Sequence, residues 1–428
     1  MSRLQRDSSG GLTLQGVPLE ALVERAPRGT PFYVYDLDSM TDEVDAMRAA
    51  FGAEPHLVAY AVKANSAGPI LRALASRGAG ADVVSGAELE LAVAAGVVPG
   101  QIVYSGVAKL DDELDRALSI GWDGILALQA ESIEELPRIA ARARAVGRRG
   151  RVSLRLNPDI EADTHSYIAT GHDEAKFGIP IEDLGDAIRL AGSHPEIELV
   201  GLGSHIGSQL TTTERYAEAA ETIVRRWLEV HADLSSRGGG LRLVDFGGGF
   251  GIDYGAGCDA RPADFVVALR ERSRALPPDV LRVVEPGRSV VASHGLLVTR
   301  VVMQKRTLAR AEQRRWVMVD AGMNDLLRPA LYGASHRIDL VRSSSAPRSA
   351  ARVVGPVCES SDDFGSYDLP EQLDLLAIRD AGAYGFTMAS EYNGRPLPCE
   401  LFLRGGAVAE ILVPRSAAQW VADRLRSR

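Results

Sequence analysis

The stretch Leu57-Val58-Ala59-Tyr60-Ala61-Val62-Lys63 decides the fold, because it is an apolar run of strand length that ends in a lysine. Similar runs recur as far as residue 288 and alternate with longer amphipathic segments, such as Ser85–Ala95 and Glu131–Ala145. Strands separated by helices and buried on both faces predict a parallel sheet. The runs are Leu57–Lys63, Ala81–Ser85, Ile102–Ser105, Gly124–Leu128, Val152–Leu156, Leu199–Ile206, Leu241–Phe246 and Leu281–Glu285. Eight such units favour an α/β fold with a closed (β/α)8 barrel, and an open doubly wound sheet is the alternative.

A different pattern begins after residue 290, where short strands and turns replace the helices. We predict a barrel over residues 31–290 and a mostly antiparallel β domain over residues 291–428. The strand-like piece Gly11–Val17 does not fit the barrel, so residues 1–30 are predicted to pair with the β domain. Ser343–Ala351 is predicted to be a surface loop. The other elements predicted for this domain are Gly295–Lys305, Trp316–Asp320, Ala351–Val357, Leu373–Ile378, Glu400–Leu403 and a helix over Ala417–Arg428.

The composition excludes several classes of function. The net charge of −9 argues against a nucleic-acid partner, and no apolar run reaches the roughly 18 residues of a membrane span. The first residues lack the apolar stretch of a secretory signal. Three scattered cysteines, Cys258, Cys358 and Cys399, are too few for a disulfide framework or a zinc site. We therefore expect a cytoplasmic protein.

Lysine is rare in this chain, which has four lysines against 44 arginines. An arginine keeps its charge, whereas a desolvated lysine can lose its proton and act as a nucleophile. Lys63, at the end of a buried strand, is therefore a candidate for an imine with an aldehyde cofactor. The alternative is a lysine that extends its charge to solvent from a strand end.

Polar residues follow six of the eight predicted strands. In a barrel the active site lies where the strands end, so these residues are expected on one face. They are Lys63, Asn65, Asp82, Ser85, Arg155, Asn157, His205, Ser208, Gly247–Gly251, Glu285 and Arg288.

Three of these features have a specific chemistry and also a structural alternative. Gly247–Gly251 (GGGFG) follows the seventh strand, where glycine amides can bind phosphate, although a glycine-rich turn alone is weak evidence. Glu285 could hold a protonated ring nitrogen, or it could pair with Arg288 to close the barrel. His205 could stack on a planar cofactor, or it could be structural. Together with Lys63 these features match the needs of pyridoxal phosphate.

The chain resembles the diaminopimelate decarboxylases, pyridoxal-phosphate enzymes with an alanine-racemase-like barrel and a C-terminal β domain. The resemblance rests on motifs spread over most of the chain: AYAVKAN (59–65), FGI (177–179), HIGSQ (205–209), GGGFG (247–251), EPGR (285–288), DAGMNDLLRPALYGA (320–334), GPVCESSD (355–362) and DAGAYGFTMAS (380–390). Two segments depart from the family pattern. Gly203-Ser204 stands where we expect a His-Cys pair, and EYNGRP (391–396) replaces Asn-Tyr-Asn-Ser-Arg-Pro.

The resemblance implies a cofactor site in the barrel. Lys63 bonds to the cofactor aldehyde, His205 stacks on the pyridine ring and Glu285 faces the ring nitrogen. The other cofactor contacts implied are Asp82, Ser208, Gly247, Gly248, Gly249, Gly287, Arg288 and Tyr384.

The resemblance also implies a substrate and a homodimer. Arg288, Arg328 and Tyr332 receive the distal carboxylate of meso-2,6-diaminopimelate, Glu359 receives its distal ammonium, and Tyr384 also lies beside the substrate. Cys358 comes from the neighbouring subunit and moves a proton after CO2 is lost. Two guanidinium groups suit a carboxylate, and a substrate without one would leave them unpaired.

Other functions remain as alternatives. A decarboxylase for ornithine, lysine or another diamino acid should lack the carboxylate-binding arginines, Arg288 and Arg328, and Glu359. A racemase should have a tyrosine base opposite the lysine. A relative that binds the cofactor without turnover should lose Lys63 or Cys358. A metal-dependent hydrolase is disfavoured, because the eight histidines form no HxH or HExxH spacing.

Overall fold

The computed structural model describes residues 3–158, 176–307 and 314–426. The chain divides into two compact units. The barrel unit comprises Thr41–Asp253 and Gly257–Val290. The β unit comprises Met1–Met40, Tyr254–Ala256 and Val291–Arg428.

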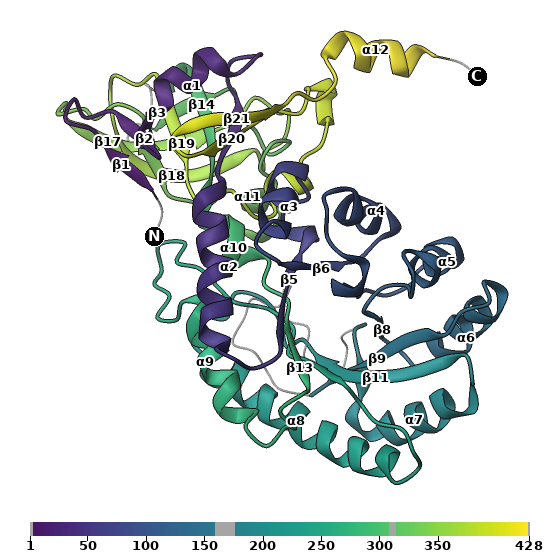
Figure 1. The fold of residues 1–428 in the computed structure, drawn as a ribbon. Helices are drawn as coiled ribbons and strands as arrows, with labels where there is room; N and C mark the ends of the chain where they lie inside the picture. The colour runs from purple at the N-terminus through teal and green to yellow at the C-terminus, as the bar shows by residue number, and fades with distance from the viewer. Residues whose placement is uncertain (1–2, 159–175, 308–313, 427–428) are drawn as a thin grey trace. The chain divides into compact units, whose positions relative to one another are not determined.

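Eight parallel strands form the barrel unit and close on themselves (Figure 1). Closure occurs where β13 pairs with β5 and β8 pairs with β9. The strands are β5 (His56–Ala61), β6 (Gly80–Val83), β7 (Ile102–Tyr104), β8 (Ala127–Ala130), β9 (Gly150–Asn157), β11 (Ile197–Ser204), β12 (Leu243–Asp245) and β13 (Leu281–Val284), with a short β10 (Ile179–Pro180) beside β9. Each overlaps an apolar run of the sequence, so the predicted closed barrel is confirmed and the open sheet is wrong.

Helices connect these strands, as the amphipathic segments predict. They are α2 (Leu37–Phe51), α3 (Gly68–Ala75), α4 (Gly86–Ala94), α5 (Asp111–Ser119), α6 (Glu135–Ala145), α7 (Leu184–Ser193), α8 (Glu214–Ser235), α9 (Pro262–Arg272) and the short α10 (Arg288–Val291). Ser85 begins α4 as its N-cap, where its hydroxyl accepts a hydrogen bond from the backbone N–H of Glu88 at 3.2 Å.

Apolar and polar side chains occupy different positions along the barrel strands. Leu57, Ala59, Val103 and Val283 form part of the apolar core. Buried polar side chains lie at or just past the carboxyl ends of β7, β8, β12 and β13, namely Ser105, Gln129, Asp245 and Glu285. Burying four polar groups costs free energy unless they are paired, so this end of the barrel is specialised for something other than stability.

A mixed, mostly antiparallel sheet is the centre of the β unit. Its strands run in the order β18-β17-β15-β14-β4-β20-β21, with β19 pairing to β14 and β16. The strands are β4 (Phe32–Asp36), β14 (Gly295–Arg306), β15 (Arg315–Val319), β16 (Ile338–Leu340), β17 (Arg348–Val354), β18 (Asp363–Pro370), β19 (Leu375–Ile378), β20 (Cys399–Arg404) and β21 (Ala407–Leu412). The helices α11 (Arg328–Tyr332) and α12 (Ala417–Leu425) also belong to this unit.

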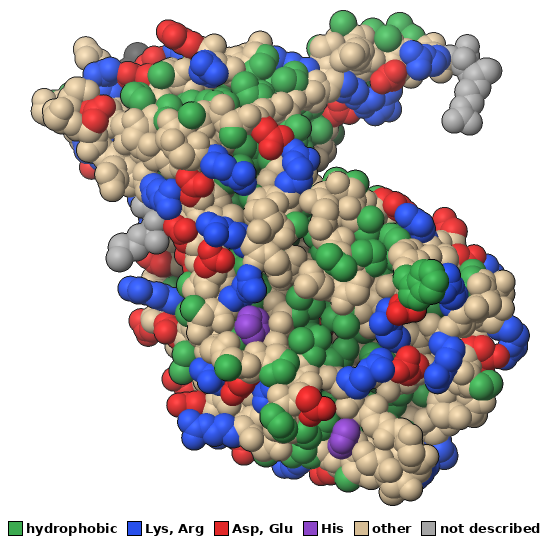
Figure 2. Space-filling view, viewed as in Figure 1, with side chains coloured by type: hydrophobic (Ala, Val, Ile, Leu, Met, Phe, Trp, Pro, Cys, Tyr) green, Lys and Arg blue, Asp and Glu red, His purple; other side chains and the backbone are tan. Residues whose placement is uncertain are grey.

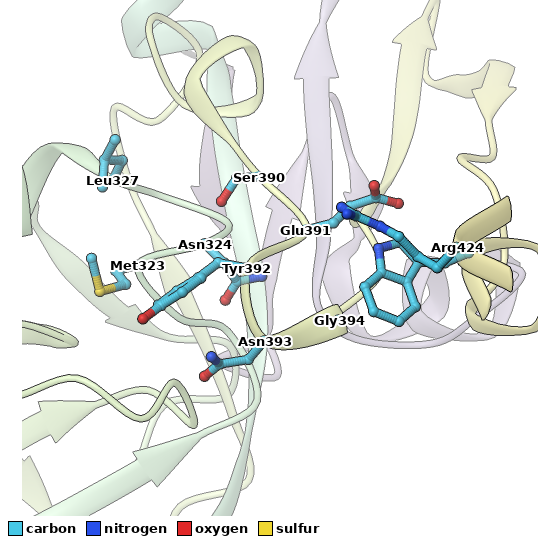
Figure 3. A pocket seen from close by; sticks show the side chains of 10 residues that line it. Met323, Asn324, Leu327, Ser390, Glu391, Tyr392, Asn393, Gly394 and Arg424 are labelled. Atoms are coloured by element: carbon cyan, nitrogen blue, oxygen red, sulfur yellow. The ribbon is translucent and has the colours of Figure 1, made fainter.

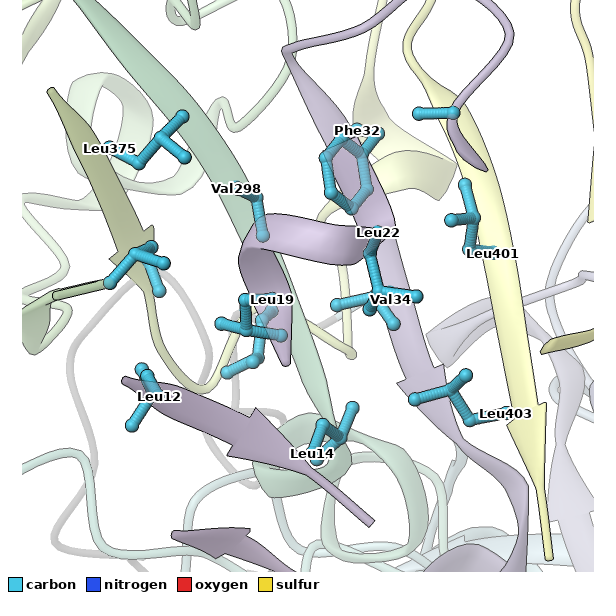
Figure 4. Packing of buried hydrophobic residues seen from close by; sticks show 14 of the residues in the cluster. Leu12, Leu14, Leu19, Leu22, Phe32, Val34, Val298, Leu375, Leu401 and Leu403 are labelled. Carbon is cyan, nitrogen blue, oxygen red and sulfur yellow. The ribbon is translucent and has the colours of Figure 1, made fainter. Parts of the chain in front are cut away.

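The N-terminal segment packs on this sheet. It contains β1 (Leu4–Arg6), β2 (Leu12–Leu14), β3 (Val17–Pro18) and α1 (Leu19–Arg25). The N–H of Leu12 donates to the carbonyl of Val341 at 2.7 Å, and the leucines of β2 and α1 share a core with β4, β14, β19 and β20 (Figure 4). Apolar burial and the backbone hydrogen bonds to Val341 and Ser343 together hold the segment in place.

Two details of the β unit differ from the sequence prediction. Phe32–Asp36, placed in the barrel by the boundary at residue 31, pairs with β14 and β20, and its five residues are all buried. An apolar run cannot reveal which of two sheets will bury it. Part of the predicted loop Ser343–Ala351 is also wrong, since β17 begins at Arg348 and pairs with β15 and β18. Its polar sequence has little strand propensity, and its two neighbours supply the pairing.

Acidic and basic side chains are interspersed over the face shown in Figure 2. Among the helices within the described ranges, none has the length and apolar character needed to cross a membrane.

Glu400 in β20 gives a test of stability. Burial raises the pKa of this carboxyl from 4.5 to about 8, and its neighbour is the Tyr35 hydroxyl, which donates to Oε1 at 3.0 Å. The folded protein favours the protonated carboxyl. The contribution of this group to stability is therefore fully present below pH 4.5 and is lost as the pH rises through about 8. We expect Glu400→Gln, which keeps the acceptor, to raise the unfolding free energy at pH 8.5 by about 1–3 kcal/mol and to give no gain at pH 4.5.

Thermal melts at both pH values check this prediction, with Asp368→Asn, at an exposed position of β18, as the control. An equal shift at both pH values would contradict it.

Candidate active site

Lys63 lies in a single 3-10 turn, Val62–Ala64, directly after β5. Its Nζ forms an ion pair with Oδ2 of Asp82 at 2.8 Å, and the Asp82 side chain is fully buried at the end of β6. The Lys63 side chain is 37% exposed, so a small molecule can reach its amine. The other carboxylate oxygen of Asp82 is buried without a hydrogen-bond partner in the described structure. An unsatisfied buried oxygen beside a reachable amine is typical of a binding site.

The glycine-rich loop after β12 is shaped by close backbone contacts. A Cβ on Gly248 would lie 2.0 Å from the carbonyl oxygen of Glu285, and one on Gly249 would lie 2.4 Å from that of Gly207. Gly247 and Gly249 also have positive φ values of 63° and 95°. Only glycine fits this loop, so a bound phosphate can approach its backbone closely, as phosphate binding requires.

His205 follows β11 and lies against the same loop. Its Nδ1 accepts a hydrogen bond from the N–H of Gly248 at 3.1 Å, so the ring proton is on Nε2. Burial, with repulsion from Arg155 and Lys63, lowers the pKa of this histidine well below 6.5. The ring is therefore neutral at pH 7 and presents a flat, uncharged surface.

Glu285 follows β13 and is buried. Burial and repulsion from Asp245 and Asp82 raise the pKa of its carboxyl well above 4.5. The hydroxyl of Ser105 lies 3.3 Å from its Oε1. An ionised Glu285 needs a nearby cation, and a protonated pyridine nitrogen would supply one.

Arg288 and Ser208 complete the predicted barrel site. Nη2 of Arg288 donates to Oγ of Ser208 at 2.9 Å. The preceding glycine packs on the Lys63 turn, because a Cβ on Gly287 would lie 3.0 Å from the Cβ of Ala64. The structure therefore brings the barrel residues predicted from sequence to one end of the barrel: Lys63, Asp82, His205, Ser208, Gly247, Gly248, Gly249, Glu285, Gly287 and Arg288.

These residues fit pyridoxal phosphate. The chain offers a reachable amine, a glycine loop whose backbone a phosphate can approach, a neutral flat ring and a buried carboxylate for a ring nitrogen. Across residues 3–158, 176–307 and 314–426, no group of three or more His, Cys, Asp or Glu side chains is placed to hold a metal ion.

The remaining predicted residues belong to the β unit. Arg328 begins α11 and is buried, with its guanidinium 4.6 Å from the centre of the Tyr254 ring and 3.0 Å from Nε2 of His336. Tyr332 ends the same helix and is half-buried. Tyr384 has a positive φ of 56°. These contacts orient the Arg328 guanidinium, and its role toward a substrate carboxylate stays a prediction.

Cys358 and Glu359 lie on an exposed loop between β17 and β18. The N–H of Cys358 donates to Oδ1 of Asn393 at 3.0 Å, and the Tyr392 hydroxyl donates to Oε1 of Glu359. Asp362 fixes the loop by accepting from the N–H of Val357 at 2.6 Å.

Tyr392 and Asn393 belong to the EYNGRP segment, which departs from the family pattern. Both also line an open cavity of about 900 Å³ in the β unit, together with Met323, Asn324 and Trp420 (Figure 3). The segment therefore both supports the Cys358 loop and forms a wall of this cavity.

Two buried residues near the site, Glu131 and Asp245, were not assigned a role from sequence. Glu131 accepts from Nη1 of Arg155 at 2.8 Å and from the N–H groups of Gly106 and Gly178 at 3.0 and 3.1 Å, so it joins three loops at the barrel mouth. Asp245 is the second. Its position two residues before Gly247 was the available signal, since Asp often accepts from a backbone N–H two residues ahead.

The sequence is similar to known proteins over nearly its full length. Residues 37–292 match the family described as "Pyridoxal-dependent decarboxylase, pyridoxal binding domain". The chain is 42% identical over 403 residues to the diaminopimelate decarboxylase of Pseudomonas aeruginosa, covering 94% of this chain and 93% of that protein. It is 40% identical over 407 residues to that of Vibrio cholerae, covering 95% and 94%.

Solved structures give the same result. The crystal structure of diaminopimelate decarboxylase from Helicobacter pylori complexed with L-lysine has a TM-score of 0.85 and 38% identity, and the match covers 95% of this chain and 99% of that one. The M. jannaschii enzyme in co-complex with L-lysine has a TM-score of 0.87 and 32% identity, covering 99% and 98%.

Proposed function

The chain belongs to the pyridoxal-dependent decarboxylases, with diaminopimelate decarboxylases as relatives along nearly its whole length, and from this premise we propose that it converts meso-2,6-diaminopimelate to L-lysine and CO2, the last step of lysine biosynthesis. The observation that supports this most strongly is the 2.8 Å pair of Lys63 and Asp82, at the barrel end that also holds the glycine loop and Glu285.

The barrel residues would hold pyridoxal phosphate between them. The amides of the glycine loop and the Ser208 hydroxyl would bind the phosphate, and Lys63 would bond to the aldehyde carbon. When bound, this cofactor withdraws electrons from the α-carbon of an amino acid and so allows CO2 to leave. Glu285 would hold the proton on the ring nitrogen, and the neutral His205 ring would cover one face and exclude water.

The β-unit residues would recognise the substrate. Arg328 and Tyr332, with Arg288, would bind the distal carboxylate, and Glu359 would bind the distal ammonium. Tyr384 would touch both phosphate and substrate. Cys358 would deliver a proton to the carbon that has lost CO2, which a thiol can do when its proton is held at the reacting atom.

We infer that the enzyme is a homodimer in which Cys358 and Glu359 act in the partner's site, because both side chains are exposed on a loop of the β unit. A mixture of Lys63→Ala and Cys358→Ala, each with at most about 1% of the parent activity alone, should then regain about a quarter of that activity after dissociation and reassociation, since half of the dimers are mixed and each has one intact site. No recovery in a mixture shown to contain mixed dimers would contradict shared sites. A cytoplasmic location is also part of the proposal and rests on the composition.

The substrate is tested by CO2 release from meso-diaminopimelate, ornithine and lysine with the same enzyme preparation. We expect release from meso-diaminopimelate and at least about 100-fold less from the other two, because neither has a distal carboxylate for Arg328 to bind. Faster release from ornithine or lysine would instead identify a decarboxylase of the same fold for another diamino acid.

A further inference from the structure

A second buried carboxylate, Asp245, lies beside Glu285 and has no part in the proposed function. Asp245 ends β12 and is 1% exposed. Its strand pairs with β13, so Asp245 lies opposite Val283, two residues before Glu285. The N–H of Glu285 also donates to the carbonyl of Gly247 at 2.8 Å. The two acidic residues therefore sit on neighbouring strands at the same end of the barrel.

Asp245 connects the glycine loop to Glu285 through side chains. Its Oδ1 accepts from the N–H of Gly247 at 2.8 Å, and its Oδ2 accepts from Nε2 of Gln129 at 3.3 Å. The Ser105 hydroxyl lies 3.3 Å from Oε1 of Gln129 and 3.3 Å from Oε1 of Glu285. A continuous polar network thus runs from the predicted phosphate end of the site to the predicted ring-nitrogen end.

Gly203 in β11 leaves the space for this network. A Cβ at Gly203 would lie 2.8 Å from Nε2 of Gln129 and 3.1 Å from the Cβ of Asp245. Any side chain there would displace the Gln129 amide from Asp245. Gly203 belongs to one of the two segments that depart from the family pattern, so the arrangement is linked to a feature of this chain.

The charges around Asp245 favour retention of a proton. The groups that face it are the carboxylates Asp82 and Glu285, the cation Arg155 and the buried phenol Tyr216. Lys63 faces Glu285. The two cations form their ion pairs with other carboxylates, Lys63 with Asp82 and Arg155 with Glu131.

Burial raises the pKa of both Asp245 and Glu285, and repulsion adds to it, from Asp82 at Asp245 and from Asp245 and Asp82 at Glu285. Two adjacent carboxylates in such a site cannot both ionise at low cost, so the pair keeps one proton.

We propose that Asp245 is a positioning residue that shares one proton with Glu285 when the cofactor is not bound and, by accepting from the N–H of Gly247, fixes the glycine loop in the shape that admits the phosphate. The inference rests on the proposed function, since the group that enters is the pyridine of pyridoxal phosphate. On entry the O–H bond of the shared proton breaks, an N–H bond forms on the ring nitrogen, and both side chains are left as carboxylates. The proton then comes from the protein and not from solvent.

The proton is counted by calorimetry of pyridoxine 5′-phosphate binding at pH 7.5 in two buffers of different ionisation enthalpy. This probe has no aldehyde, so Lys63 chemistry does not contribute. We expect the parent to take almost no proton from the buffer and Asp245→Asn to take up about one, because the amide keeps an acceptor for the N–H of Gly247 but carries no acidic proton. Glu285→Gln should take up none, because its amide cannot stabilise a charged ring. Equal proton uptake by the parent and Asp245→Asn would overturn the proposal.

The role in fixing the glycine loop is tested separately with inorganic phosphate. Asp245→Ala removes the acceptor for the N–H of Gly247 and should weaken phosphate binding about tenfold, whereas Asp245→Asn should bind as the parent does. Asp233→Asn, on the exposed side of α8 and paired with Arg237, is the control and should change neither measurement. Equal phosphate affinity of Asp245→Ala and the parent would remove the role in fixing the loop.

Infrared difference spectra of the parent protein keep the proposal testable if the Asp245 variants do not fold. Binding of pyridoxine 5′-phosphate should remove the C=O stretch of one protonated carboxyl, and an unchanged band would overturn the proposal. None of these measurements requires turnover. If the proton counts are as expected but no CO2 is released from meso-diaminopimelate, only the proposed function is contradicted. If CO2 is released normally but the parent and Asp245→Asn take up the same number of protons, only the role of Asp245 is contradicted.

Discussion

Lys63→Ala is expected to lower the rate of CO2 release about 10³–10⁴-fold and to abolish the visible absorption band of the bound cofactor that borohydride bleaches. The reason is local, since Lys63 Nζ is the amine that pairs with buried Asp82 at the end of the barrel that also holds the glycine loop. The variant should still fold, because the Lys63 side chain is partly exposed. Absorbance spectra and CO2 release measured on the same preparation check both effects.

Lys305→Ala is the matched control. Lys305 is exposed on β14 and lies 5.6 Å from the centre of the Trp316 ring, so its loss should change neither the band nor the rate. A Lys63→Ala variant that kept the borohydride-sensitive band would show that another amine holds the cofactor.

Cys358→Ala is expected to lower the steady-state rate of turnover, measured as CO2 release, about 10²–10⁴-fold while leaving cofactor binding intact, because a positioned proton donor contributes a factor of that size. The side chain is exposed, so its removal should not affect folding. The expected signature is a normal cofactor spectrum with slow turnover, and single-turnover kinetics would show a delay in protonation of the product carbon.

The two other cysteines provide controls for this variant. Cys258 is half-buried, with its Sγ near the carbonyl oxygens of Thr211 and Ala260, and Cys399 is buried in β20. Cys258→Ala should retain the parent rate. A Cys358→Ala variant with the parent rate and normal product would show that the proton comes from another group.

The barrel could be predicted from sequence because each strand is a continuous apolar run bounded by polar residues. The β unit was harder. Phe32–Asp36 is as apolar as a barrel strand, and only its pairing with β14 and β20 assigns it to the second sheet. The strands β16, β18 and β21 were missed, since their half-exposed residues include Asp, Ser and Glu and give no apolar run.

The scarcity of lysine would have singled out a second residue equally well. Lys109 is buried, with a side-chain exposure of 1%, and its Nζ pairs with Glu135 at 2.8 Å and donates to the carbonyl of Gln129 at 2.8 Å. It is a structural lysine, because its ammonium group is buried and hydrogen-bonded to protein groups. Lys63 differs because it follows a strand directly and its partner Asp82 lies at the end of the next strand. Its position at the end of a barrel strand was therefore better evidence for a catalytic lysine than the scarcity of lysine.

The network around Asp245 could not be predicted from spacing. Ser105, Gln129, Asp245 and Glu285 come from four strands, and only closure of the barrel brings them together. Each is an ordinary polar residue in its own segment.

The most direct measurement is to load the enzyme with pyridoxal phosphate, reduce it with borohydride and locate the modified residue by peptide mass spectrometry. The structure predicts a phosphopyridoxyl group on the peptide that contains Lys63, with Lys109, Lys176 and Lys305 unmodified. Prior addition of meso-diaminopimelate should protect Lys63, because the substrate amine displaces the lysine from the aldehyde carbon. Label on another lysine, or no label on an enzyme that releases CO2, would contradict the assignment of Lys63 as the residue that holds the cofactor.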